Sequence, residues 1–315
     1  MYQRIVVLDS GTFYGHPSFQ ESLQGLGELE IYDFTDKSQV KDRIANANIV
    51  LTNKVVIGRD TIENSVLLKL ICVTATGMNN IDLKAASEKG VIVKNAKGYS
   101  TDSVAQMTFA MAFQLTMNLK RHNDYAQSNY KNNHFFTHLS PSFSELKGKT
   151  WGIIGLGTIG KKVAEIATVF GCKAVYHSPS GMNLNTNYDH LTLSELLKES
   201  DYISIHTPLN EFTNNLLNYN NLKLCKSTCI LINVARGGIV DEEGLSKALN
   251  EELIAGAATD VFSIEPILAE NPLLSIKNKD RILLTPHIAW GSLEARQNLM
   301  NITRENIIEY LKTGR

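Results

Sequence analysis

The sequence has few cysteines, no excess of charge of one sign and no long apolar run. Its four cysteines in 315 residues are too few and too scattered for a disulfide framework. Cys225 and Cys229 lie close together, but no second cysteine or histidine pair stands at zinc-ligand spacing. We therefore expect no metal site and interpret the cysteines as small buried hydrophobic residues.

The charge balance excludes further classes of partner. Lys plus Arg number 31 and Asp plus Glu 32, which gives a net charge of −1 and no basic surface for nucleic acid or anionic lipid. The apolar run at Ile5–Leu8 is too short for a signal peptide, and no run is long enough to span a membrane. These absences predict a cytoplasmic protein without nucleic-acid or membrane partners.

Short apolar runs alternate with amphipathic stretches through the first hundred residues. Hydrophobic residues make up 43% of the chain and charged residues 20%, as in globular proteins, and the length suggests two domains. Alternation of strands and helices indicates a parallel sheet covered on both faces. The predicted strands are Ile5–Leu8, Leu29–Tyr32, Ile49–Leu51, Leu70–Val73 and Val91–Val93, with helices at 39–47 and 83–89.

A long helix and an irregular segment separate this series from a second one. Ser103–Lys120 is apolar almost all round, which predicts a helix buried on most sides. His122–Leu146 is polar without a clear period, and we predict an irregular arm there. A second α/β series starts at Lys147, and a final helix is predicted at Ser292–Lys312. The strands predicted in the second series are Trp151–Ile154, Lys173–His177, Tyr202–Ile205, Cys229–Ile232, Ile254–Thr259 and Arg281–Leu284.

The strongest local motif is a glycine-rich turn between a strand and a helix, within residues 150–171. Gly155 permits the tight turn, Gly157 lets the backbone approach a pyrophosphate, and Gly160 allows the helix to pack closely on the strand. The helix N-terminus then offers N–H groups and a positive dipole end to phosphates. Its strand–turn–helix context makes this motif a prediction of dinucleotide binding.

The residue expected to contact the cofactor's ribose leaves the choice of cofactor open. An acidic residue normally stands about 20 residues beyond the first glycine. Here that position is Ser178 or its neighbour, and the following stretch contains neither Arg nor Lys. The carboxylate that favours NAD and the cation that would hold a 2′-phosphate are both missing. The sequence favours NAD without excluding NADP.

Three polar residues each follow a predicted strand in the second series. Arg236 stands in NVARGG, Glu265 in DVFSIEP and His287 in TPHIAW. Open α/β sheets bind ligands beyond the carboxyl ends of their strands, so we expect these side chains to converge there. Arg, Glu and His together indicate an anion clamp and a glutamate-oriented acid or base.

The order GLGTIG, NVARGG, Glu265 and PHIAW resembles the D-isomer-specific 2-hydroxyacid dehydrogenases over essentially the whole chain. Within that family the sequence is most similar to the glycerate dehydrogenase/hydroxypyruvate reductase branch. The central glycine motif disfavours the L-lactate and malate dehydrogenases, where it lies near the N-terminus. The segments that support the branch are TNKVVI, TATGMNNIDL, YSTDSVAQ and PHIAWGS.

The resemblance implies a role for each residue at the substrate. His287 would donate a proton to the reduced 2-keto oxygen, Glu265 would orient its imidazole, and Arg236 would hold the substrate carboxylate. Backbone N–H groups of Ala75, Thr76 and Gly77 would hold the same carboxylate. Two assignments stay open: Lys54 either assists polar substrates or faces solvent, and Trp290 either walls the pocket or packs.

The resemblance also implies the cofactor contacts. Thr158 and Ile159 would contact the pyrophosphate, and Ser178 the ribose. Asp260 would contact the nicotinamide amide. The remaining residues expected near the cofactor are Thr207 and Pro208 on the adenine side, with Val234, Ala235 and Ser103 near the nicotinamide.

The implied fold is α/β, with two Rossmann-like or flavodoxin-like doubly wound parallel-sheet domains and a cleft between them. Residues 1–99 with 288–315 would form the substrate domain, and 100–287 the NAD(P)-binding domain. The region 103–146 is expected to form a homodimer interface.

The expected activity is glycerate dehydrogenase or hydroxypyruvate (glyoxylate) reductase. The alternatives are a D-lactate or broader 2-keto-acid reductase, and a non-enzymatic NAD-sensing protein like the corepressors that share this fold.

Overall fold

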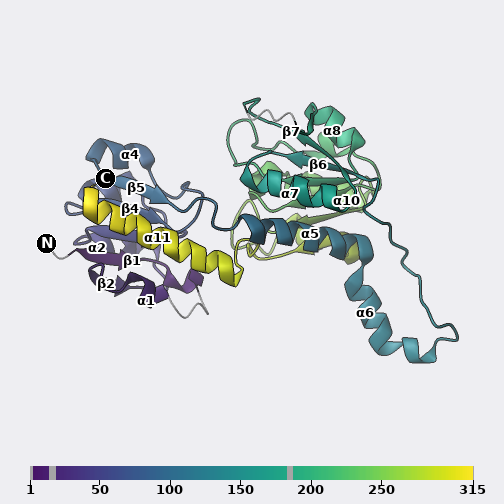
Figure 1. Cartoon of the computed structure of the whole chain (residues 1–315), viewed down its shortest axis with the longest axis horizontal. Helices are drawn as coiled ribbons and strands as arrows, with labels where there is room; N and C mark the ends of the chain where they lie inside the picture. The colour runs from purple at the N-terminus through teal and green to yellow at the C-terminus, as the bar shows by residue number, and fades with distance from the viewer. Residues whose placement is uncertain (1–2, 14–18, 183–186, 315) are drawn as a thin grey trace. The chain divides into compact units, whose positions relative to one another are not determined.

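The computed structural model describes residues 3–13, 19–182 and 187–314. It divides into two compact units (Figure 1). Unit 1 consists of Met1–Ser100 with Gly291–Arg315, and unit 2 of Thr101–Trp290. Each unit is a parallel sheet with helices, as the alternating pattern predicted, so the expected α/β fold is confirmed.

Unit 1 holds a five-stranded parallel sheet in the order β2-β1-β3-β4-β5. Its central strands are buried along their whole length because helices cover both faces. The C-terminal helix α11 (Leu293–Thr313) lies against β4 and β5, which joins the two ends of the chain in one unit. The strands are β1 (Arg4–Val7), β2 (Glu28–Ile31), β3 (Ile49–Thr52), β4 (Leu70–Val73) and β5 (Ile92–Asn95).

The helices of unit 1 begin and end at residues suited to those positions. The Asp82 carboxylate accepts a hydrogen bond from Ala85 N–H at the start of α4, and Gly90 ends that helix in the left-handed conformation. Ser292 caps α11 in the same way, and Gly314 ends it. The other helices are α1 (Phe19–Leu23), α2 (Val40–Ile44), α3 (Arg59–Asn64) and α4 (Leu83–Lys89), with short 3₁₀ turns η1 (Ser10–Phe13) and η2 (Lys37–Gln39).

Unit 2 holds a seven-stranded parallel sheet in the order β12-β11-β10-β9-β6-β7-β8. Trp151 on β6 stacks on Tyr202 of β9, and its indole N–H donates to the buried Ser204 hydroxyl at 2.9 Å. This pair lies in the core beneath α5 and α7, and a second core fills the other face. The strands are β6 (Thr150–Ile154), β7 (Lys173–His177), β8 (Asp189–His190), β9 (Tyr202–Ile205), β10 (Ile230–Asn233), β11 (Gly256–Thr259) and β12 (Ile282–Leu284).

Helices cover both faces of the unit 2 sheet. The long ones on one face are α5 (Thr101–Met117) and α7 (Thr158–Val169), which pack against each other. Across the described residues, no helix combines the length and the apolar character needed to cross a bilayer. The remaining helices are α6 (Leu119–Ser128), α8 (Leu193–Glu199), α9 (Tyr219–Leu222) and α10 (Glu242–Asn250), with 3₁₀ turns η3 (Tyr130–Asn132), η4 (Gly237–Ile239), η5 (Pro272–Ser275) and η6 (Lys279–Arg281).

The segment after α5 differs from the irregular arm predicted at 122–146. The predicted helix 103–120 ends at Met117, because Asn118 adopts the left-handed conformation with φ of 50°. A new helix, α6, then occupies 119–128, so the prediction of irregular chain was wrong for residues 122–128. From 129 to 146 the chain forms only the short turn η3, as the polar composition indicated.

Candidate functional site

Five loops of unit 2 meet at the carboxyl edge of its sheet. The strands β12, β11, β10, β9 and β6 are neighbours in that order and all run in the same direction. The loops that follow them therefore lie side by side, next to the point where the strand order reverses between β9 and β6. Ligands bind at such a reversal in open α/β sheets.

The glycine motif has the shape that a dinucleotide requires. A Cβ at Gly155 (φ 94°) would lie 2.8 Å from the His206 carbonyl oxygen, and one at Gly160 would lie 2.2 Å from the Gly155 carbonyl oxygen. Both positions therefore exclude any side chain. A Cβ at Gly157 would meet nothing within 4 Å, so the space in front of that residue is open. These residues and the N-terminus of α7 fit a pyrophosphate.

A histidine beside this motif has a buried polar atom that is not used. Nε2 of His206 is inaccessible to solvent and has no hydrogen-bond partner in the described part of the chain. Burial lowers the pKa of His206 to about 3, so the imidazole is neutral at physiological pH. Thr207, which follows, is buried, and Pro208 is exposed.

In the turn after β7, the residue expected to contact the ribose, Ser178, is buried. Ser178 is only 6% exposed and its carbonyl accepts a hydrogen bond from Gly181 N–H at 3.0 Å. Ser180 in the same turn is exposed. The structure therefore adds Ser180 to Ser178 as a candidate for contact with the ribose, while residues 183–186 lie outside the described part of the chain.

His287 and Glu265 form a hydrogen-bonded pair. His287 Nδ1 and Glu265 Oε2 are 2.7 Å apart, and both side chains are partly buried. Glu265 Oε1 accepts a hydrogen bond from Phe262 N–H at 3.0 Å, which fixes the carboxylate. The pairing uses Nδ1, and Nε2 of His287 has no partner among the described residues. Nε2 is therefore the ring nitrogen that can exchange a hydrogen bond or a proton with a ligand.

The backbone of His287 is strained, and Asp260 holds it. His287 has a φ of 55°, in the left-handed region that non-glycine residues adopt uncommonly. Its N–H donates to the Asp260 carbonyl oxygen at 2.8 Å. The Asp260 carboxylate, with no exposed surface, accepts from the N–H groups of Ile288 and Ala289, each at 2.8 Å, and from the Thr285 hydroxyl at 2.5 Å.

Burial raises the pKa of Asp260, and these hydrogen bonds oppose that rise. Sequence reasoning expected Asp260 at the nicotinamide amide and missed its contact with the histidine turn. The signal for that contact was weak, because the two segments are separated by more than twenty residues of chain.

Arg236 lies in a tightly packed loop beside the same pair. The Asn233 side chain accepts from Ala235 N–H and donates to the Arg236 carbonyl oxygen, which shapes the turn. A Cβ at Gly237 would lie 2.0 Å from the Phe262 carbonyl carbon, so this loop contacts the segment that leads to Glu265. The guanidinium donates to the Ala235 carbonyl oxygen at 2.7 Å and forms no ion pair with any described residue. Most of its donors are therefore available to an anion.

The remaining residues predicted in unit 2 lie around these loops. The Ser103 hydroxyl donates to the Ala289 carbonyl oxygen at 2.7 Å, so α5 is tied to the histidine turn. Trp290 is partly buried and packs against the core of unit 2. Thr158 is exposed at the start of α7, Ile159 and Ala235 are partly buried, and Val234 is buried.

In unit 1, the predicted substrate residues follow the neighbouring strands β3 and β4. The Asn53 side-chain amide donates to the Thr74 carbonyl oxygen at 2.8 Å, which joins the two loops. Lys54 and Thr76 are exposed, and Ala75 and Gly77 are partly buried. All of them lie at the carboxyl edge of the five-stranded sheet.

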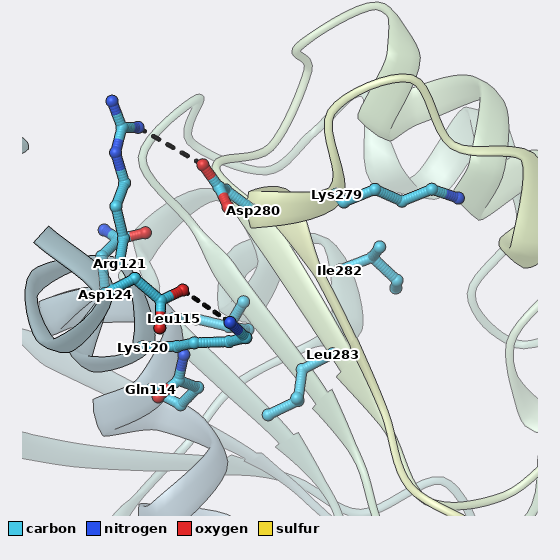
Figure 2. Close-up of a pocket in the computed structure, with 10 residues that line it drawn as sticks. Gln114, Leu115, Lys120, Arg121, Asp124, Lys279, Asp280, Ile282 and Leu283 are labelled. Atoms are coloured by element: carbon cyan, nitrogen blue, oxygen red, sulfur yellow. Dashed lines mark hydrogen bonds and ion pairs between the residues drawn. The ribbon is translucent and has the colours of Figure 1, made fainter. Parts of the chain in front are cut away.

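A separate hollow of about 540 Å³ lies in unit 2 beside β12 (Figure 2). Two ion pairs border it, Lys120–Asp124 at 2.6 Å and Arg121–Asp280 at 3.3 Å. Leu115, Ile282 and Leu283 contribute its apolar part. It contains none of the predicted catalytic or cofactor residues.

Comparison with known proteins agrees with this arrangement. Residues 109–289 match the profile of the D-isomer specific 2-hydroxyacid dehydrogenase NAD-binding domain. The chain is 37% identical to a hydroxypyruvate reductase of Blautia hydrogenotrophica over 98% of its own length and 97% of that protein.

Two solved structures are similar over nearly the whole chain. One is an acyclic imino acid reductase in complex with NADPH and D-arginine, with 30% identity and a TM-score of 0.87, covering 98% of this chain and 97% of that one. The other is a D-lactate dehydrogenase of Aquifex aeolicus in complex with NAD and lactic acid. It has 29% identity and a TM-score of 0.84, covering 98% of this chain and 95% of that one.

Proposed function

The chain belongs to the D-isomer specific 2-hydroxyacid dehydrogenase family of NAD(P)-dependent oxidoreductases, and on that premise we propose that it reduces hydroxypyruvate or glyoxylate. The observation that carries the proposal is the Glu265–His287 pair beside the Arg236 loop. The choice of substrate is supported by the similarity to a hydroxypyruvate reductase. The alternatives are a D-lactate or broader 2-keto-acid reductase and an NAD-sensing binding protein.

We propose that His287 acts as the proton donor. A reduced nicotinamide cofactor, held at the glycine motif of Gly155, Gly157 and Gly160, would supply a hydride for C2 of the keto acid. As C2 accepts the hydride, negative charge develops on its oxygen, and His287 Nε2–H donates a proton to that oxygen. We propose that Glu265 accepts from Nδ1–H and so fixes the orientation of the imidazole.

Arg236 is proposed to hold the substrate carboxylate. Its planar guanidinium offers two parallel N–H groups to a carboxylate, a geometry that an ammonium group lacks. We propose that backbone N–H groups of Ala75, Thr76 and Gly77 also bind this carboxylate and that Lys54 assists polar substrates.

The four cysteines are unpaired, which fits a reducing compartment such as the cytoplasm.

The activity is tested by following the absorbance of reduced nicotinamide with hydroxypyruvate, glyoxylate and pyruvate, each with NADH and with NADPH. Fast turnover with hydroxypyruvate or glyoxylate supports the proposal. Preference for pyruvate would support the D-lactate alternative instead. NADH binding without turnover of any keto acid would contradict the proposed reaction and favour the sensing role.

The choice between cofactors is tested at the turn after β7. We expect Ser178→Asp to raise the preference for NADH over NADPH roughly tenfold, because a carboxylate binds the ribose hydroxyls and repels a 2′-phosphate. The measurement is the ratio of kcat/KM for the two cofactors. Ser180→Asp is the matched variant, since Ser180 is exposed in the same turn. A shift in that variant alone would assign the ribose contact to position 180.

We also propose that the chain forms a homodimer through the 103–146 region. In Figure 1, α6 and the segment after it extend away from the rest of unit 2, and α6 has no buried residue. Phe136 on this segment is 91% exposed. Several large apolar side chains exposed close together on one segment indicate a protein interface. The other exposed apolar residues of the segment are Leu119, Tyr130, Phe135, Leu139 and Phe143.

The interface is tested by replacing Phe136 with aspartate. We expect this variant to sediment as a monomer at concentrations where the unmodified protein is a dimer, because a charge cannot be buried in an apolar contact without a partner. Phe34→Asp is the control, since Phe34 is exposed in unit 1. An unmodified protein that sediments as a monomer would contradict the proposal.

A further inference from the structure

A buried carboxylate in unit 1 holds the loop that follows β3. Asp9, just beyond the end of β1, is only 5% exposed. Its Oδ2 accepts from Lys54 N–H at 2.6 Å and from Val55 N–H at 3.3 Å, and its Oδ1 accepts from Asn53 N–H at 2.9 Å. The Thr52 hydroxyl donates at 3.4 Å. Three successive N–H groups converge on one anion, as in the backbone nests that bind anionic ligands.

This loop is fastened in turn to the loop after β4. Asn53 is buried, and its side-chain amide donates to the Thr74 carbonyl oxygen at 2.8 Å. Thr74 N–H donates to the Thr52 carbonyl oxygen at 2.9 Å. The two loops that carry the proposed substrate residues of unit 1 are therefore one hydrogen-bonded assembly anchored on Asp9.

In Lys54, the backbone is held by a hydrogen bond and the side chain is exposed. Its backbone makes the shortest of the hydrogen bonds to Asp9, while its side chain is exposed. Asp9 forms no ion pair with a described residue, so its charge is balanced by backbone and hydroxyl donors alone. Burying a carboxylate is unfavourable unless such donors are fixed around it. The fixed donors hold the Lys54 Cα in one place.

We propose that Asp9 is a positioning residue for the substrate: it fixes the Lys54 backbone so that the Lys54 ammonium meets the polar end of a 2-keto acid such as hydroxypyruvate. The inference rests on the proposed function, because it takes a keto acid as the substrate. Asp9 itself contacts no substrate atom. It acts through residues 53–55, and its effect is confined to substrates that carry a polar group for Lys54.

The test is a double-mutant cycle with Asp9→Asn and Lys54→Ala. Asparagine has the size of aspartate but only one acceptor oxygen, so its amide N–H₂ faces either Asn53 N–H or Lys54 N–H. We expect Asp9→Asn to raise KM for hydroxypyruvate roughly tenfold, with kcat and KM for NADH nearly unchanged. KM for glyoxylate, which lacks the hydroxymethyl group, should change much less.

The coupling between the two residues separates positioning from a general structural role. If Asp9 acts through Lys54, Asp9→Asn changes KM for hydroxypyruvate little in the Lys54→Ala protein. Additive effects would overturn the inference. Asp82→Ala is the control: it removes the cap of α4 in the same unit and should lower stability without raising KM.

Two further measurements keep the outcomes distinct. Hydrogen exchange should show that the amides of residues 53–55 lose protection in Asp9→Asn while those of β4 keep it. If Asp9→Asn does not fold, Asn53→Ala loosens the same loop from Thr74 and should also raise KM for hydroxypyruvate. No turnover of any keto acid by the unmodified protein overturns the proposed function. An unchanged KM in an active enzyme whose loop has lost protection overturns the role of Asp9 alone.

Discussion

Replacement of His287 by alanine is expected to lower kcat for keto-acid reduction roughly 10²- to 10⁴-fold, the range for loss of a general acid. Nε2 of His287 is the ring nitrogen that the pairing of Nδ1 with Glu265 leaves available, and we propose that it carries the donated proton. The loss falls on the chemical step, because the proton is needed only as charge develops on the substrate oxygen. Single-turnover oxidation of bound NADH measures that step, and fluorescence titration measures the Kd for NADH, which should hardly change.

His134→Ala is the matched control for this experiment. His134 is exposed on the segment after α6 and is remote in sequence from the loops at the sheet edge. Its replacement should leave single-turnover rates at the level of the unmodified enzyme. Keto-acid reduction that continued at full rate in His287→Ala would remove His287 from the mechanism. A large loss of NADH affinity would instead indicate that the histidine turn supports the cofactor.

The sheets could be predicted from the sequence because their signals are local. Runs such as Ile49–Leu51 and Leu70–Val73 are apolar and β-branched, and they became central buried strands. The helix α6 was missed because residues 119–128 are mostly polar and none of them is buried, so no apolar stripe facing a core marks the helix. The start of α6 depends on the left-handed conformation of Asn118. A single asparagine in the sequence does not predict that conformation.

The candidate site shows the same division between local and distant signals. The glycine motif was predictable because Gly155 and Gly160 contact each other within one turn. The roles of two buried aspartates, Asp9 and Asp260, could not be predicted from the sequence. Asp9 binds amides more than forty residues away, and Asp260 binds the turn at 285–289. Such contacts depend on which strands become neighbours, and strand order is set by the packing of the whole sheet.

Arg236→Lys is expected to lower kcat/KM for a 2-keto acid about 100-fold, because one of the two parallel hydrogen bonds to the substrate carboxylate is lost and the other is weakened. Charge alone is conserved in this variant, so the loss measures the planar geometry of the guanidinium. In the structure that guanidinium is bonded to the Ala235 carbonyl oxygen and to no described carboxylate. It therefore contributes no ion pair to the fold, and the variant should unfold at nearly the same temperature.

Arg281→Lys is the control for Arg236→Lys. Arg281 pairs with Glu252 at 3.1 Å and donates to the Ile254 carbonyl oxygen at 3.2 Å, at the amino end of β12 and away from the loops proposed to bind substrate. Steady-state kinetics should therefore separate the two substitutions by about the full 100-fold. An Arg236→Lys enzyme as active as the Arg281→Lys enzyme would mean that a point charge suffices. The carboxylate would then be bound mainly by other donors, and the backbone N–H groups of Ala75, Thr76 and Gly77 would be the first to examine.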